Sequence, residues 1–228
     1  MTANAALARQ LTVDVWSDIA CPFCWIGEHR LETALAGLRA EWPEVEVARR
    51  WRPFQLQPDL PRPGVAWAEF ARAKFGGEAG MAGAFGQVTR MGAEDGLEYR
   101  FDRIAAAPNT ADAHRLLLHA QVADPSGIAA ARLAEGLFRA YFHEGRHVGE
   151  RQVLTELAAA EGLDAADVAL VLDGTRYADE VRASQVEAAR LGIRGVPFVV
   201  LGGRYAVSGA QPVDVFARAI ATAAGAPA

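Results

Sequence analysis

The chain has 228 residues, 51% of them hydrophobic, and a formal net charge of −5 at pH 7. A chain of this length can bury a real core, either as one domain or as one domain that carries an insertion. Its mildly acidic charge gives no general reason to bind nucleic acid or an anionic membrane, so we expect neither as a partner.

The first part of the chain predicts a strand, a helix and a second strand. Residues 11–17 (LTVDVWS) alternate apolar and polar side chains, as a strand with one buried face does. Pro22 suits the first turn of a helix, which we expect to end before Pro43. Residues 44–51 alternate again and predict the second strand. The proline-rich segment 53–64 cannot form a regular helix or a central strand, so it leads into a different region.

The middle of the chain is almost wholly helical in pattern. From Val65 to about Leu191, Ala, Leu, Glu and Arg dominate the sequence. Turn residues divide this block into several helices, at Gly76–Gly77, Pro108, Asp124–Gly127, Gly145–Gly149 and Asp173–Gly174.

After Gly192 the pattern returns to strands. Residues 197–201 (PFVVL) are a short apolar run of the kind found in buried strands. Gly202–Gly203 indicates a hairpin turn, and residues 204–207 form the returning strand. Pro212 then opens a last amphipathic helix.

The order of these elements predicts the fold class. A thioredoxin fold is β-α-β followed by β-β-α, and this chain has that order with a helical block between the halves. We therefore predict an α/β protein, a thioredoxin fold with a large all-helical insertion, which is longer than an ordinary loop. The expected thioredoxin-like domain is discontinuous, residues 11–62 and 192–224, and the inserted helical domain is 63–191.

The two cysteines of the chain, Cys21 and Cys24, lie where the first strand meets the first helix. Disulfide exchange needs a thiolate, because a thiol is a poor nucleophile. A helix N-terminus offers unpaired N–H groups and about half a positive charge, which favour the anion on Cys21. Cys24 follows one helical turn later and can reach it. We expect Cys21 to attack a substrate disulfide and Cys24 to resolve the mixed disulfide.

Two other interpretations of the cysteine pair are half of a zinc site and a pair of inert buried thiols. Zinc would need two further ligands, both of them His, since the chain has no other cysteine. Residues 143–147 (HEGRH) match the zinc-protease pattern, but Gly145 and Gly149 indicate a helix end rather than one continuous helix. We therefore predict no metal site.

Pro197 begins the predicted strand 197–201, where a proline removes one donor from the hydrogen-bond ladder. A cis peptide bond would accommodate it in a tight turn, and so would a trans proline at a strand edge. From this position alone the trans form is favoured, since cis bonds make up only about 5–6% of X–Pro bonds in folded proteins.

Five separate segments carry a resemblance to a known family. In chain order they read WSDIACPFCWIG, RPFQLQP, NTADAHRL, GVPFVV and RYAVSGAQP, and they span about residues 11–220. Together they resemble segments of the DsbA family of thiol–disulfide oxidoreductases, in its FrnE-like branch. The fold that this resemblance implies, a thioredoxin domain with a helical insertion, agrees with the predicted order of elements.

The resemblance also implies roles for site residues. Cys21 would be the nucleophile, Cys24 the resolving thiol and Pro197 a cis-proline that faces them. Val196 would offer its backbone to an extended substrate peptide, as an added strand. Further candidates for substrate binding are Pro22, Phe23 and His114.

His114 belongs to the NTADAHRL segment together with Asn109 and Arg115. It would either line the groove between the insertion and the dithiol or be a hydrogen-bonded histidine between the two regions. The second interpretation is favoured, because a titratable group needs a cleft before it counts as functional. We keep His114 as a candidate on the strength of the matched segment.

We therefore predict an enzyme, a disulfide oxidoreductase that acts on protein or small-molecule thiols and disulfides. No cofactor is expected because the two sulfurs carry the electrons, and glutathione is a possible co-substrate. The alternative is a glutathione-dependent isomerase similar to 2-hydroxychromene-2-carboxylate isomerase. Such proteins typically carry Ser where Cys21 stands, which argues against it. A third interpretation is a redox-insensitive binding module that inherits the fold.

The compartment is predicted from what the sequence lacks. The N-terminal residues contain no uninterrupted apolar run of the kind that secretory signals have. No stretch of about 18 or more apolar residues occurs either, so no membrane span is expected. We therefore expect a cytoplasmic protein.

Overall fold

A four-stranded sheet forms the thioredoxin-like part of the computed structural model, which describes residues 9–225. In spatial order the strands are β2 (Val45–Pro53), β1 (Arg9–Ser17), β5 (Phe198–Leu201) and β6 (Tyr205–Ser208). Strand β1 runs parallel to β2 and antiparallel to β5, which in turn runs antiparallel to β6. Parallel neighbours need a crossover connection, and helix α1 (Pro22–Glu41) provides it.

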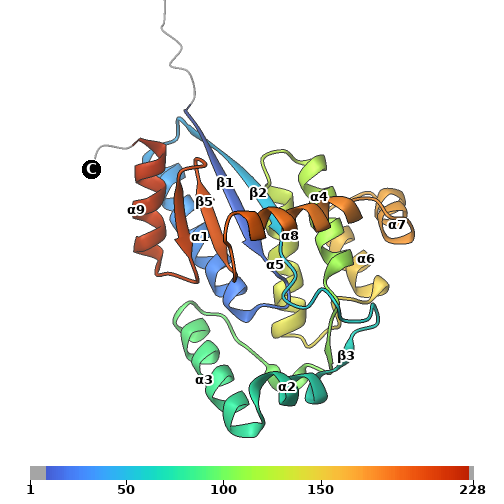
Figure 1. Ribbon diagram of the computed structural model, residues 1–228. Helices are drawn as coiled ribbons and strands as arrows, with labels where there is room; N and C mark the ends of the chain where they lie inside the picture. The colour runs from blue at the N-terminus through green and yellow to red at the C-terminus, as the bar shows by residue number, and fades with distance from the viewer. Residues whose placement is uncertain (1–8, 226–228) are drawn as a thin grey trace, which may run out of the picture.

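Helices cover both faces of this sheet (Figure 1). Helix α1 and the last helix, α9 (Val213–Ala224), pack on one face, and α8 (Ala178–Arg190) crosses the other. The alternation of side chains along β1 explains this arrangement. Val15 lies in the hydrophobic cluster with α1 and α9, whereas its neighbour Trp16 lies in the cluster that includes Ala188 of α8.

Between β2 and β5 the chain forms the predicted helical block. The helices before α8 are α2 (Trp67–Phe75), α3 (Glu78–Glu94), α4 (Ala111–Ala123), α5 (Ile128–Phe142), α6 (Arg151–Ala160) and α7 (Ala165–Asp173). This order confirms the predicted thioredoxin fold with a helical insertion. Of the helices within residues 9–225, none has the length and apolar character needed to cross a membrane.

Sequence reasoning misses two short features of the insertion. Strand β3 (Val65–Ala66) pairs antiparallel with β4 (Ala106–Ala107), and a 3₁₀ turn, η1, spans Phe101–Arg103. Strands of two residues are too short for any alternation to be detected. They matter here because they hold the two ends of the α2–α3 segment together.

The insertion closes the open edge of the sheet at β2. The backbone N–H of Arg49 donates to the carbonyl of Ser126 at 3.0 Å, and that of Trp51 donates to Gln121 Oε1 at 2.5 Å. Pro53, the next residue on this edge, has no N–H to satisfy. Unpaired backbone N–H and C=O groups at a sheet edge can pair with a strand of another chain. Here the α4–α5 hairpin occupies that edge.

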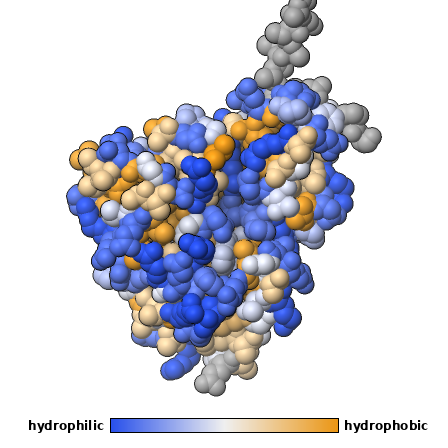
Figure 2. Space-filling model, turned by 180° about the vertical axis from the view of Figure 1, so that it is seen from behind, coloured by the Kyte–Doolittle hydropathy of each residue, from blue (hydrophilic) through white to orange (hydrophobic). Residues whose placement is uncertain are grey.

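The larger hydrophobic core is shared between the sheet region and the insertion. Cys21, Cys24 and Trp51 lie in the same cluster as Leu116 of α4 and Phe138 of α5. The domain limits expected at residues 62/63 and 191/192 stay a prediction. On the face shown in Figure 2, hydrophilic side chains are interspersed with several small apolar groups.

Candidate active site

The two cysteines lie at the start of α1, as predicted, and differ in how far they are buried. Cys21 is the N-cap residue, with extended backbone angles, and its N–H donates to the Asp18 carbonyl at 3.0 Å. Both thiols are free. Cys21 is 4% exposed and lines a cavity, whereas Cys24 is 0% exposed. A substrate therefore meets the Cys21 sulfur first.

Burial also separates the two thiols chemically. It raises the pKa of the Cys24 thiol well above its ordinary value, and the hydrogen bond and the charge of Cys21 raise that pKa further. The Ser17 hydroxyl and the backbone of Asp18 act in the opposite direction. Cys24 thus keeps its proton while Cys21 is the sulfur that faces the cavity. A resolving thiol needs this asymmetry, because it must ionise only after the mixed disulfide has formed.

The loop before β5 faces the dithiol from the other end of the chain. The Val196–Pro197 peptide bond is cis, and the Cys21 Sγ donates to the Val196 carbonyl at 3.6 Å. Val196 and Pro197 also line a shallow groove of about 390 Å³, which extends from Gly192 to Gly209. The cis bond is the form that the family resemblance implies, whereas the position of Pro197 alone favoured trans, and the substrate-binding role of these residues stays a prediction.

Gly27 allows this close approach, and sequence reasoning missed it. A Cβ atom at Gly27 would lie 2.7 Å from Cγ of Pro197, which is too close for two carbon atoms. The absence of a side chain therefore lets α1 pack directly against the cis-proline. A glycine in the interior of a predicted helix is the signal that could have found it, because glycine is unfavourable there without a packing reason.

His114 lines neither the cavity in front of Cys21 nor the groove at Val196, and its substrate-binding role stays a prediction. The side chain is 0% exposed. The indole N–H of Trp51 donates to His114 Nδ1 at 3.1 Å, and an indole nitrogen can only donate. The imidazole proton therefore lies on Nε2, 3.4 Å from Asp18 Oδ1. His114 is the hydrogen-bonded histidine between two regions that the sequence offered as the favoured interpretation.

Asp18 is a site residue that sequence reasoning missed. It is 1% exposed, and its Oδ2 accepts a hydrogen bond from the N–H of Leu56 at 2.7 Å. Its Oδ1 accepts from the N–H of Ala20 and faces His114. This carboxylate fixes the loop that ends at Cys21. Its place in the segment WSDIAC, three residues before the cysteine, was the available signal.

Tyr99 fixes the start of α1 from the opposite side. Its hydroxyl donates to the Pro22 carbonyl at 2.6 Å. Burial, and then the charges of Cys21 and Cys24, raise the pKa of Tyr99, so the hydroxyl stays protonated and remains a donor. The first turn of α1 is thus held in place by groups outside the helix.

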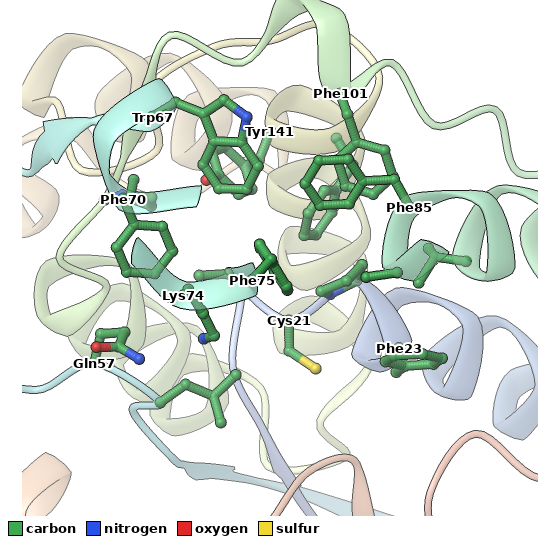
Figure 3. A pocket seen from close by; sticks show the side chains of 18 of the residues that line it. Cys21, Phe23, Gln57, Trp67, Phe70, Lys74, Phe75, Phe85, Phe101 and Tyr141 are labelled. Carbon is green, nitrogen blue, oxygen red and sulfur yellow. The ribbon is translucent and has the colours of Figure 1, made fainter. Parts of the chain in front are cut away.

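A cavity of about 340 Å³ opens in front of Cys21. Pro22 and Phe23, two predicted substrate-binding residues, line it beside the sulfur. Figure 3 shows Cys21 and Phe23 on one side of the cavity, with aromatic rings from the insertion across from them. The cavity volume lies in the range of small-molecule binding sites. Sequence reasoning placed the dithiol here but did not find the aromatic wall.

The zinc-protease pattern is broken by the end of a helix, as predicted. Helix α5 ends at Phe142 with His143 as its C-cap, and Gly145 follows with φ +73°. The His143 ring lies 3.1 Å from the Glu98 carbonyl, and the His147 ring lies 3.0 Å from the Pro63 carbonyl. The two imidazoles therefore do not share a helix face. Within the part of the chain that the structure describes, no cluster of three or more His, Cys, Asp or Glu could hold a metal.

Comparison with known proteins agrees with this fold. A DSBA-like thioredoxin domain model matches residues 12–221. A solved structure from Streptomyces coelicolor, described as the probable DsbA oxidoreductase SCO1869, is 38% identical, with a TM-score of 0.81 over 96% of this chain and 92% of the other. The uncharacterised protein YwbO of Bacillus subtilis strain 168 is 28% identical over 91% of this chain and 94% of its own.

A more distant structure shares the fold. The cytosolic disulfide reductase DsbM from Pseudomonas aeruginosa, solved with GSH, is 22% identical and covers 91% of this chain and 96% of its own, with a TM-score of 0.60. These matches confirm the resemblance that the five sequence segments carry, and the FrnE-like branch is consistent with them. The chain belongs to the DSBA-like thioredoxin domain family.

Proposed function

We propose that the chain is a thiol–disulfide oxidoreductase that works through Cys21 and Cys24. The observation that carries this proposal is the unequal burial of two adjacent thiols. Cys21 faces a cavity at a helix N-terminus, and Cys24 lies behind it with a raised pKa. The loop before β5 lies beside the same sulfur, since the Val196 carbonyl is 3.6 Å from it.

The reaction follows from this arrangement. The Cys21 thiolate attacks one sulfur of a substrate disulfide, the substrate S–S bond breaks, and one substrate thiolate leaves. Cys24 then gives up its proton and attacks the Cys21 sulfur, which releases the second substrate thiol. The substrate disulfide gains two electrons, and the protein dithiol becomes the Cys21–Cys24 disulfide. The reverse sequence oxidises a substrate dithiol.

We propose reduction as the direction and glutathione as the thiol that restores the dithiol. Two molecules of glutathione would supply the two electrons and leave as glutathione disulfide. The support is the DsbM structure, a cytosolic disulfide reductase with GSH, which shares this fold. A cytoplasmic location, our expectation from the sequence, fits this direction because that compartment keeps thiols reduced. The substrates are protein or small-molecule disulfides.

The test is the reduction of insulin disulfides by the wild type and two variants. We expect Cys21→Ser to fall to the uncatalysed rate, because it removes the nucleophile. We expect Cys24→Ser to complete the first displacement and to accumulate a mixed disulfide at Cys21, detectable by mass spectrometry. A Cys21→Ser variant as active as the wild type would overturn the proposal.

Two other outcomes would indicate the alternatives. Isomerisation of 2-hydroxychromene-2-carboxylate that requires glutathione and survives Cys24→Ser would indicate a glutathione-dependent isomerase. A complete lack of thiol reactivity in the native protein would indicate a binding module that has the fold without the chemistry.

A further inference from the structure

The cavity in front of Cys21 is walled by aromatic rings of the insertion. Trp67 comes from α2, Phe85 from α3 and Phe101 from η1, so the wall combines three elements. The Phe85 and Phe101 rings stack with centroids 4.3 Å apart, and Trp67 stacks on Phe85 at 5.9 Å. All three side chains are only half-buried, and Figure 3 shows them across the cavity from Cys21.

This wall favours a flat apolar ligand. Aromatic rings that are only half-buried gain most from covering their remaining surface with another ring, by stacking or edge-to-face contact. The cavity, at about 340 Å³, has the size of a small-molecule site rather than of a folded partner. Phe23, beside the reactive sulfur, adds one more ring at the point where a substrate sulfur would sit.

One positively charged side chain lines this largely apolar cavity. Of the lining residues that the structure describes, Lys74 is the one with a charged side chain, and it is also the only lysine in the sequence. Its ammonium lies 5.3 Å from the centroid of the Phe70 ring. Figure 3 shows the Lys74 amine and the Gln57 amide on the same side of Cys21. Charge complementarity therefore favours a ligand with one anionic group.

We propose that this pocket takes a small aromatic disulfide that bears an anionic group, with the ring against the Trp67–Phe85–Phe101 wall and the anion at Lys74. The inference rests on the proposed function and names its substrate class. Cys21 attacks the ring-bound sulfur, and the partner thiolate leaves. Cys24 then displaces the aryl thiolate and forms the Cys21–Cys24 disulfide. Two electrons pass from the protein dithiol to the substrate, and a thiol such as glutathione restores the dithiol.

The test uses four disulfide probes and a reduced protein, so that no external reductant is needed. 5,5′-Dithiobis(2-nitrobenzoate) is aromatic and anionic, and 4,4′-dithiodipyridine is aromatic and neutral. Dithiodiacetate is aliphatic and anionic, and bis(2-hydroxyethyl) disulfide is aliphatic and neutral. Each second-order rate is divided by the rate of the same probe with N-acetylcysteine, which removes the intrinsic reactivity of the probe. We expect the aromatic anionic probe to have the highest normalised rate.

Variants at two positions of α2 then distinguish an effect of the Lys74 charge from a change in structure. We expect Lys74→Gln to lower the normalised rate of the aromatic anionic probe about fivefold, as for a partly exposed ion pair, and to leave the neutral probes unchanged. Lys74→Arg restores the rate, and the effect weakens as salt is raised, because salt screens exposed charges. The matched control is Arg72→Gln, an exposed residue of the same helix outside the cavity lining, which should change no probe.

A second readout does not depend on rate. Since Lys74 carries the only side-chain amine, its acetylation relative to the chain's α-amine reports on the pocket. We expect the mixed disulfide of Cys24→Ser with the nitrobenzoate thiol to slow acetylation of Lys74 and not of the α-amine.

The outcomes distinguish this inference from the proposed function. Equal normalised rates for all four probes, or a Lys74→Gln variant that matches the wild type, would overturn the inference and leave the oxidoreductase in place. Failure of Cys21 to react with any of the four would overturn both.

Discussion

Two surfaces of different construction meet at the Cys21 sulfur. On the side of the sheet, the backbone carbonyl of Val196 and the cis bond before Pro197 face it. On the side of the insertion, aromatic side chains and Lys74 face it. A surface of backbone groups can bind any extended substrate, whereas a surface of side chains selects substrates by their shape and charge. In the function that we propose, the thioredoxin half therefore supplies the thiols and the insertion supplies the selectivity.

The largest effect is expected within the sheet side, where β2, the strand that the insertion covers, is paired with α1. Arg49 of β2 forms a buried ion pair with Glu28 of α1, and both side chains are 7% exposed. Burial lowers the pKa of Arg49 to about 10. We expect Arg49→Ala to lower the free energy of unfolding by about 3–5 kcal/mol, because Glu28 is left buried and unpaired. Urea unfolding of the reduced protein measures this.

The matched control is Arg182→Ala, which removes an exposed ion pair with Asp179, where both side chains are at least 70% exposed. Exposed pairs contribute little, so its unfolding curve should overlay that of the wild type. If both variants lost the same small amount of stability, the Arg49–Glu28 pair would not hold β2 against α1 as we describe.

The next largest effect on stability is expected from substitutions at two glycines of α1, which test the sheet side alone. Gly27 packs against Pro197, whereas a Cβ at Gly37 would meet nothing within 4 Å. We expect Gly27→Ala to cost about 1–3 kcal/mol of stability by overpacking. Gly37→Ala should instead gain about 0.5–1 kcal/mol, since alanine is the better helix former. Thermal and urea unfolding of both variants provide the measurement.

Activity measurements should also distinguish Gly27→Ala from Gly37→Ala. Displacement of Pro197 by Gly27→Ala moves the Val196 carbonyl relative to the Cys21 sulfur, so we expect insulin reduction to fall about tenfold or more. The aromatic probes contact the other surface and should lose less. Equal losses for insulin and for the aromatic probes would show that the two surfaces do not act separately.

The sheet side was largely predictable from sequence, and its residues show why. The dithiol, Val196 and Pro197 lie at the ends of elements that follow simple periods, and the predicted strand 197–201 differs from β5 (Phe198–Leu201) only at its proline. The expected helix end before Pro43 agrees with α1, which ends at Glu41. Local pattern sufficed for where these residues lie, because each position is set by its chain neighbours, whereas the cis bond before Pro197 was implied only by the family resemblance.

The insertion side was not predictable in the same way. Trp67, Phe85 and Phe101 come together only through tertiary packing, with the β3–β4 bridge closing the segment between them. Nothing in their spacing indicates that they share a cavity. The position of His114 is a related case, because the matched segment marks this residue without saying which way its helix faces. A sequence pattern indicates which face of a helix is buried but not how deeply a single side chain is buried. The structure shows that His114 is fully buried.

The smallest effect concerns the buried thiol on which the reaction order depends. The pKa of Cys24 is raised from its ordinary value of 9.0 by burial and by Cys21. An unfolded chain therefore loses this proton at lower pH than the native protein does. The stabilising contribution is complete below about pH 9 and is lost as pH rises through the native pKa, with a slope of at most about 1.4 kcal/mol per pH unit.

We expect the stability of the reduced wild type to fall more steeply above pH 9 than that of Cys24→Ala, which has no proton to lose at this position. Urea unfolding of both proteins in excess reductant, in steps from pH 7 to pH 10.5, measures the difference. The subtraction cancels the tyrosines, whose pKa values burial also raises. Parallel curves would mean that Cys24 ionises as easily in the native protein as in the unfolded chain. The two sulfurs would then lack the asymmetry that makes one the nucleophile and the other the resolving thiol.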